Sequence, residues 1–233
     1  MPRRRRWPMA ANQTSTAAAR QEVLGRIRAA IAAPAADAAD IDAEWRALPR
    51  DYKRSASLDR DAILDMLEDR LRDYDATVVR ARAGAVTAEI ACFIAARNLH
   101  RLIVPAGLPQ ALGEPLPGGF EFTVDTGFSP VELDAFEGVV TASTLAIAET
   151  GTIVLQNVPG QGRRASTLIP DYHLCVVRAA DVVETVPEAM DRLAPTATLA
   201  TTFISGPSAT ADIEMTRVKG VHGPRFLDVI LVV

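Results

Sequence analysis

An acid and a hydroxyl, Glu149 and Thr150, separate two apolar runs at residues 145–148 and 152–155. Because Gly151 follows them and can adopt a positive φ without steric strain, the two runs are predicted to form strands joined by a tight turn. The turn would lift the carboxylate and the hydroxyl out of an apolar ribbon. A carboxylate in this position could be a general base, a nucleophile in acyl chemistry, or only the acidic member of a turn.

A second polar loop, residues 159–164, has the sequence PGQGRR and ends in two arginines. A guanidinium group pairs bidentately with a carboxylate or a phosphate, so Arg163 and Arg164 could clamp an anionic ligand. Two solvated loop arginines are an equally consistent interpretation. Together with the turn at Glu149, Gly162 and Arg163 are predicted to form the wall of a polar site.

A third polar segment follows the apolar run at residues 202–204 and precedes a helix predicted over residues 208–216. The first turn of a helix presents unpaired N–H groups and about half a positive charge, which suits a carboxylate or a phosphate. The alternative is that the segment supplies only a turn and a helix cap. It lacks the glycine spacing and the following lysine of the phosphate loop in nucleotide hydrolases. The ligand-binding candidates here are Ser205, Gly206, Ser208 and Thr210.

His222 lies between two glycines, in a loop that leads into the apolar run at residues 226–233. A histidine in an ordered loop can donate a hydrogen bond or carry a proton near neutral pH, so His222 is a catalytic candidate beside Glu149. His173 opens a strand-like run, where a structural role is the more common one, and His100 is assigned no function. No two of the three histidines share a spacing that suits a metal site, and no metal is predicted.

The composition is that of a globular protein with a modest net charge. Of the 233 residues, 48% are hydrophobic and 5% aromatic, and the net charge of −4 gives no electrostatic reason to expect a nucleic-acid partner. No apolar run reaches the roughly 18 residues that a membrane helix needs. The basic residues 3–6 are not followed by the apolar stretch of a signal peptide. A cytoplasmic protein without a membrane span is therefore expected.

The two cysteines, Cys92 and Cys175, stand far apart in apolar runs and are expected to be buried and reduced. A cysteine-ligated iron–sulfur cluster needs several thiolates close together, and the chain has no C-x-x-C motif. We therefore expect no iron–sulfur cluster in this chain. The sequence identifies no other cofactor.

The order of the predicted elements favours an α/β fold. Strands and helices alternate, which is typical of a parallel sheet with crossover helices, and we expect a central mixed sheet, mostly parallel, with helices on both faces. Residues 1–16 are predicted to be a disordered basic tail, residues 17–56 a helical arm and connector, and residues 57–233 the α/β domain.

The individual elements follow from apolar periodicity and from cap residues. Ser57 or Asp59 is expected to cap the second helix, and Thr87 the third. Helices are predicted over residues 17–33, 57–74, 87–98, 187–193 and 208–216, and strands over residues 76–81, 101–104, 120–124, 139–140, 145–148, 152–155, 174–177, 201–204 and 226–233.

Five segments carry a family resemblance: AIAETGTIVL, PGQGR, LIPDYHLCVV, FISGPSATADIE and GVHGPRFLDVILV. In this order they resemble the LUD-domain family, and within it the lactate utilization protein C group, over residues 60–233. The resemblance implies a Rossmann-like, three-layer α/β/α sandwich similar to the sugar-phosphate isomerase and CoA-transferase superfamily. It also implies a part in the oxidation of L-lactate to pyruvate, together with partner proteins that carry iron–sulfur clusters.

Three functions are consistent with these patterns. The first is a lactate-utilization component that binds a small organic acid or phosphate ligand and has no redox centre of its own. The second is a stand-alone enzyme that acts on an acyl-CoA or a sugar phosphate through Glu149, by analogy with the glutamate nucleophile of the CoA-transferases, although fold alone does not fix function. The third is a structural or regulatory partner whose glycine-rich loops only shape an interface.

Overall fold

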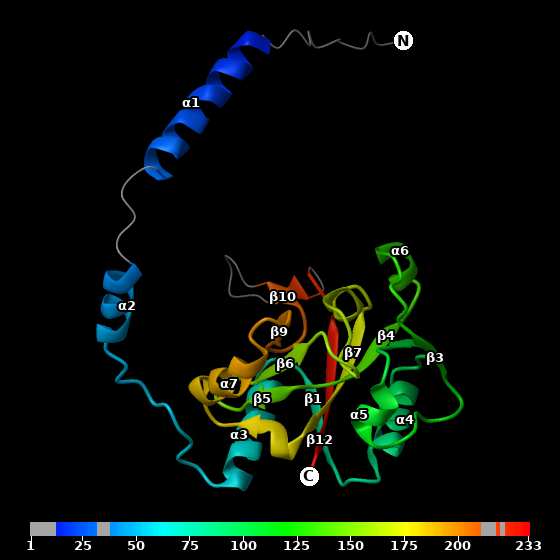
Figure 1. The fold of residues 1–233 in the computed structure, drawn as a ribbon. Helices are drawn as coiled ribbons and strands as arrows, with labels where there is room; N and C mark the ends of the chain where they lie inside the picture. Colours follow the sequence, from blue (N-terminus) through cyan, green and yellow to red (C-terminus); the bar gives the residue numbers. More distant parts are fainter. Residues whose placement is uncertain (1–12, 32–37, 211–217, 220–221) are drawn as a thin grey trace, which may run out of the picture. The chain divides into compact units, whose positions relative to one another are not determined.

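The computed structural model describes residues 13–31, 38–210, 218–219 and 222–233. The chain divides into two compact units, Met1–Tyr52 and Lys53–Val233, where the predicted domain began at residue 57. The first unit contains the helices α1 (Gln13–Ile31) and α2 (Ala38–Ala47) (Figure 1). Helix α1 begins inside the predicted tail, whose residues 1–12 lie outside the described residues, and α2 replaces part of the predicted connector.

The second unit is built on a six-stranded sheet in which all neighbouring strands run parallel, in the order β1-β12-β7-β4-β2-β3 (Figure 1). Parallel strands need crossover connections and are buried on both faces, which agrees with the alternation predicted from the sequence. The α/β class is thus confirmed, and the central sheet is purely parallel where a mixed sheet was predicted. The strands are β1 (Thr77–Ala81), β2 (Arg101–Val104), β3 (Glu121–Val124), β4 (Gly138–Ala142), β7 (Tyr172–Arg178) and β12 (Phe226–Val232).

The antiparallel pairs belong to a separate four-stranded sheet with the order β8-β5-β6-β9. Its strands β5 and β6 form the predicted hairpin, with Ala146 paired to Ile153 and Gly151 at a φ of 57° in the turn. A Cβ would be strained at this φ, which explains the glycine. The strands are β5 (Leu145–Ile147), β6 (Thr152–Gln156), β8 (Val182–Val183) and β9 (Thr201–Ile204).

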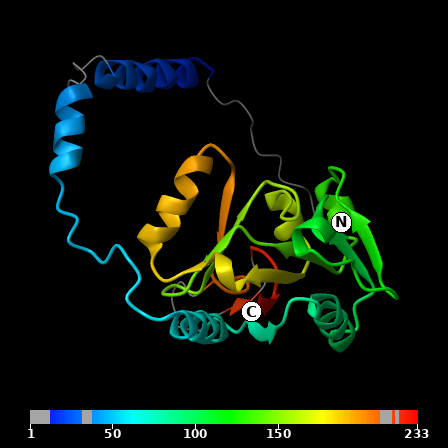
Figure 2. The same ribbon diagram turned by 60° about the horizontal axis from the view of Figure 1, so that its bottom comes forward.

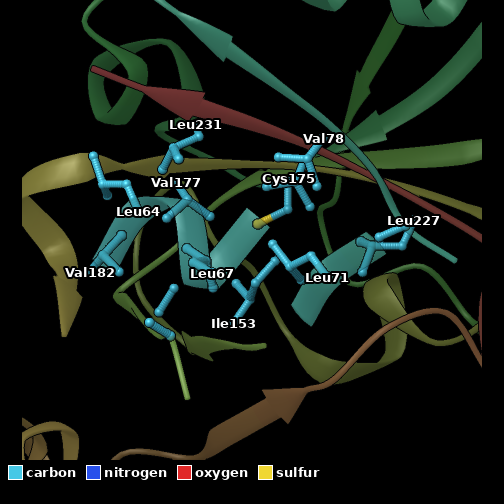
Figure 3. Close-up of a cluster of buried hydrophobic side chains, with 14 of the residues drawn as sticks. Leu64, Leu67, Leu71, Val78, Ile153, Cys175, Val177, Val182, Leu227 and Leu231 are labelled. Atoms are coloured by element: carbon cyan, nitrogen blue, oxygen red, sulfur yellow. The ribbon is translucent and has the colours of Figure 1, made fainter. Parts of the chain in front are cut away.

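Helices cover both faces of the parallel sheet (Figure 2). Helix α4 (Val86–Ala96) and the short α5 (Leu108–Leu112) pack on one face. Helix α3 (Arg60–Asp73) packs on the other, where Leu64, Leu67 and Leu71 meet side chains of β7, β12 and the small sheet (Figure 3). The last two leucines have no exposed surface, so burial of each contributes about 1.5–3 kcal/mol to stability.

The small sheet shares the second face with α3, so the layering is more complex than a plain three-layer sandwich. Helix α7 (Val186–Leu193) covers the other side of the small sheet, with Ala189 and Leu193 packed into its apolar cluster. Helix α6 (Pro130–Leu133) contributes Leu133 to a cluster on β2 and β4. The described residues of this unit also include three 3-10 turns, η1 (Arg164–Thr167), η2 (Ala179–Asp181) and η3 (Ala194–Thr196).

The caps of α3 and α4 differ in how well local sequence predicts them. Asp59 caps α3 as predicted, since its carboxylate accepts the Ala62 N–H at 2.9 Å. The prediction that Thr87 caps α4 is wrong. The Glu114 carboxylate, which lies far along the chain, accepts the N–H groups of Gly84 and Thr87 at 2.7 and 3.0 Å.

The prediction of a helix over residues 208–216 is wrong for its first residues. Strand β10 (Ala209–Thr210) pairs antiparallel with β11 (Val218–Lys219). The Ser208 N–H donates to the Pro224 carbonyl at 2.8 Å, so a long-range contact holds the backbone where a helix cap was expected. The remainder of the predicted helix, residues 211–217, lies outside the described residues.

Candidate functional site

A pocket of about 240 Å³ lies where β7 and β12 begin, on the side of the small sheet. Three segments line it: residues 202–209 at the end of β9, residues 222–224, and the η1 segment with Arg164. His173 and Leu227, from the starts of β7 and β12, are only 1% and 2% exposed and form its floor. The pocket therefore brings together parts of three of the four polar segments singled out in the sequence, and the turn at Glu149 is the one that does not line it.

The Ser205 hydroxyl is tied to the hairpin turn through a chain of hydroxyl groups. Its Oγ lies 2.7 Å from Thr152 Oγ1, which lies 2.7 Å from Thr150 Oγ1. Gly206 follows with a φ of 80°, and a Cβ there would lie 2.4 Å from the Tyr74 Cβ, so a larger residue would displace the loop. Ser205 and Gly206 thus lie in the pocket wall, with Thr150 behind them.

Ser208 and His222 connect the other walls of the pocket. The His222 N–H donates to Ser208 Oγ at 3.0 Å, and both residues line the pocket. Thr210 lies in β10, and its side chain is outside what the structure describes. Because β10 occupies the position of the predicted helix start, hydroxyl and N–H groups, and not a helix dipole, make this wall polar.

Two further ionisable residues, Arg164 and His173, line the pocket although the predicted set of site residues omits them. Arg164 is exposed, and its Nη1 lies 3.4 Å from Thr202 Oγ1. His173 Nε2 lies 2.8 Å from Thr141 Oγ1, and burial lowers the pKa of the imidazole to about 4, so the ring is neutral at pH 7. The sequence does show both residues, as the second arginine of a pair and as a histidine in an apolar strand.

Arg163 is held away from the pocket by Asp125, which follows β3. Its Nε and Nη2 donate to the Asp125 carboxylate at 2.7 and 3.0 Å, and Nη2 also donates to the Phe128 carbonyl. Burial alone would raise the pKa of Asp125, but the hydrogen bonds from Arg163 and Ser166 outweigh it and lower the pKa to about 2. Gly162 and Arg163 are both absent from the pocket lining, so the structure separates them from Ser205 and the other wall residues.

Glu149 lies in the hairpin turn and faces Lys53, whose Nζ is 3.6 Å from Oε1. Lys53 also bonds to Glu184, a fully buried carboxylate that accepts two backbone N–H bonds at 2.6 and 2.9 Å from the segment before α3. Burial alone would raise the pKa of Glu184, but these hydrogen bonds, led by the one from Lys53, lower the pKa to about 2. Glu149 does not line the pocket, so the two predicted catalytic residues, Glu149 and His222, lie in different environments.

The cysteines are dispersed and differ in exposure. Cys175 is buried as predicted, and burial raises the pKa of its thiol to about 12. The prediction of burial is wrong for Cys92, which is exposed on α4. Within the described residues, no group of three or more His, Cys, Asp or Glu side chains is placed to hold a metal ion. The helices in those same parts of the chain include none long and apolar enough to cross a membrane.

Comparison with known proteins places this pocket in a family context. The LUD domain matches residues 133–232, a range that contains every residue lining the pocket. Lactate utilization protein C of Deinococcus radiodurans is 42% identical over 221 residues, which cover 94% of this chain and 97% of that protein. A protein of the same name from Bacillus velezensis is 26% identical over 199 residues, which cover 78% of this chain and 82% of that protein.

A solved structure resembles the fold as well. The crystal structure of a DUF162 family protein from Deinococcus radiodurans matches with a TM-score of 0.65 and 39% sequence identity, covering 76% of this chain and 100% of that chain. At this identity the likeness supports the same α/β architecture in both chains.

Proposed function

The chain belongs to the LUD-domain family, in its lactate utilization protein C group, and we propose from this that it is a component of a lactate utilization system. The observation that carries the proposal is the 42% identity to Lactate utilization protein C of Deinococcus radiodurans along 94% of the chain. In this system the chain binds a small organic acid, lactate or pyruvate, in the pocket at the start of β7 and β12.

The chemistry of the pocket supports a small anionic ligand. Its volume of about 240 Å³ is below the roughly 300–1,000 Å³ of pockets that take drug-sized molecules. Arg164 supplies a cation that can pair with a carboxylate, and Ser205 and Ser208 supply hydroxyl groups in the wall. The floor residue His173 is neutral at pH 7, so it does not repel the Arg164 cation or the bound organic acid.

We further propose that partner proteins with iron–sulfur clusters accept the electrons of lactate oxidation. Conversion of lactate to pyruvate releases two electrons and two protons, which need an acceptor. The chain's two cysteines, one buried and one exposed, are too few for the four thiolate ligands that such clusters use. The role of this chain is then to bind and present the organic acid.

The alternative enzyme, acting on an acyl-CoA or a sugar phosphate through Glu149, has less geometric support. Glu149 lies outside the pocket and faces Lys53, whereas the neutral histidine, the arginine and the serines lie inside it. A nucleophilic carboxylate must reach the atom that it attacks, so a substrate in this pocket would not meet Glu149.

Calorimetric titration of the purified full chain with L-lactate, pyruvate, a sugar phosphate and CoA tests the ligand. Binding of an organic acid is expected, and Arg164→Ala should weaken it roughly 10- to 150-fold, the equivalent of about 1.5–3 kcal/mol for a charge-assisted hydrogen bond. Arg192→Ala, which removes an exposed arginine from α7, is the matched control and should bind like the unmodified chain.

The result of the titration distinguishes the organic-acid-binding component from the stand-alone enzyme. Binding of CoA or a sugar phosphate without binding of either acid would overturn the ligand assignment and support the enzyme alternative. The system role is tested in cells that depend on this protein for growth on L-lactate. Growth with Arg164→Ala equal to growth with Arg192→Ala would contradict a role for the pocket.

A further inference from the structure

A second chamber, of about 260 Å³, lies next to the organic-acid pocket. Along β9 it is lined by residues 200–202, whereas the organic-acid pocket is lined from residue 202 onward, and the two share Arg164, Thr167 and Thr202. We propose that this second chamber binds a small neutral carboxamide, which donates to Gln156 and accepts from Gln161. The inference goes beyond the proposed function, because it concerns a different ligand in a different cavity.

Two buried glutamines give the chamber its chemistry. Gln156, at the end of β6, and Gln161, in the loop that follows, line the chamber and are only 4% and 7% exposed. Burying an amide costs free energy unless its polar groups are hydrogen-bonded. Within the part of the chain that the structure describes, each glutamine has such bonds at one end of its side-chain amide, and the other end is open.

The open end of Gln161 is its NH2 group, a donor. Its Oε1 accepts the backbone N–H of Gln156 at 2.7 Å and the hydroxyl of Thr144 at 2.8 Å. A backbone N–H can only donate, so the atom that it meets must be the amide oxygen. This contact fixes the orientation of the Gln161 amide and leaves Nε2 free to donate to a ligand.

The open end of Gln156 is its oxygen, an acceptor. Its Nε2 lies 2.9 Å from the Thr196 hydroxyl and 3.2 Å from the Thr201 hydroxyl. Both hydroxyls donate their own hydrogens to backbone carbonyls, at 3.2 and 3.1 Å, so they accept from the glutamine. The NH2 group of Gln156 is therefore used within the protein, and Oε1 is free to accept from a ligand.

A donor and an acceptor on one chamber match a primary carboxamide, whose carbonyl accepts and whose NH2 group donates. Leu155 and Ala200 add apolar wall for the body of such a ligand. Arg163 adds no net charge, because it is paired with Asp125. A carboxylate has no hydrogen to donate to Gln156, so the chamber favours the neutral amide over the corresponding acid.

Nitrogen-15 NMR titration of the labelled full chain with benzamide, and with methyl benzoate for comparison, is the direct test. The ester keeps the carbonyl but has no N–H to donate, so the unmodified chain should bind benzamide about tenfold more tightly. The side-chain NH2 signals of Gln161, identified by their loss in Gln161→Glu, should shift as benzamide binds. Equal affinity for amide and ester, or no binding of benzamide, would overturn the inference.

Gln161→Glu separates recognition from the structural role of this side chain. The variant keeps an oxygen for the Gln156 N–H and loses the donor, so its affinity for benzamide should fall about tenfold or more. Gln110→Glu makes the same change at an exposed site on α5, outside the chamber, and should bind like the unmodified chain. Equal affinity of the two variants would contradict the role of Gln161. These titrations contain no organic acid, so their failure would leave the proposed function standing.

Discussion

Arg163 and Arg164 are neighbours in the sequence and have opposite surroundings in the structure. Arg163 is bound by the Asp125 carboxylate and by the Phe128 carbonyl, so its Nε and Nη2 donors are used within the protein. Arg164 begins η1, is exposed, and lines the pocket with a 3.4 Å contact to Thr202. Arg163 joins two loops through its Nε and Nη2 groups, whereas the exposed guanidinium of Arg164 can pair with a ligand.

The comparison shows how this loop combines rigidity with binding. Asp125 follows the carboxyl end of β3, and Arg163 immediately precedes η1. Their ion pair therefore ties the start of η1 to the end of β3. With its preceding residue fixed, Arg164 is presented from a defined backbone. The internal ion pair of Arg163 therefore positions the loop, and the neighbouring Arg164 is left to recognise a ligand.

Removal of the Asp125 carboxylate should produce the largest effect of the changes considered. Asp125→Ala leaves Arg163 without its anion and should lower the free energy of unfolding by about 3 kcal/mol, near the lower end for a buried pair because the arginine is 34% exposed. Urea denaturation measures this loss. Arg164→Ala should change stability by less than about 0.5 kcal/mol. Equal destabilisation by the two variants would remove the distinction between the arginines.

Acid should lower the stability of the fold through two internally paired carboxylates, Asp125 and Glu184. The folded pKa values of Asp125 and Glu184 are about 2, below their ordinary values of 3.8 and 4.5. The unfolded chain therefore binds more protons at low pH, so the stabilisation is complete above about pH 5 and is lost as pH falls toward 2. The loss should be on the order of 2 kcal/mol for Asp125.

Unfolding free energies measured from pH 7 to pH 3 test this sign and window. Asp125→Asn and Glu184→Gln cannot release a proton at these positions, so each variant should lose less stability on acidification than the unmodified chain. Other carboxylates titrate in all three proteins, and the difference between the profiles isolates the two paired groups. Parallel profiles would show that neither carboxylate is linked to folding in this range.

The parts of the fold that depend on local sequence were predictable. The hairpin at Gly151 follows from a glycine between two apolar runs, and the Asp59 cap of α3 follows from one side chain and the helix that it begins. The parallel sheet follows from alternating strands and helices. The division into two sheets depends on which strands pair, and pairing is decided by tertiary contacts that no single run encodes.

The candidate site shows the same limit at the level of residues. Ser205, Ser208 and His222 could be singled out because hydroxyls, a histidine and glycines mark polar loops. The surroundings of Arg163 depend on Asp125, and the cap of α4 on Glu114, both distant in sequence. His173 becomes informative only through its burial beside Thr141, which the spacing of residues in β7 does not reveal.

Replacement of Glu149 should have the smallest effect, and it tests whether catalysis or binding involves the hairpin turn. Glu149 and Lys53 are 37% and 44% exposed with 3.6 Å between their charged atoms, so loss of this pair in Glu149→Gln should change stability by less than about 1 kcal/mol. Affinity for L-lactate should stay within about twofold, because the pocket does not include Glu149. Calorimetry of Glu149→Gln and Arg164→Ala with L-lactate measures the two affinities side by side. A loss of affinity as large as that of Arg164→Ala, or loss of turnover of an acyl-CoA or a sugar phosphate by the chain alone, would place Glu149 in the working site and favour the enzyme alternative.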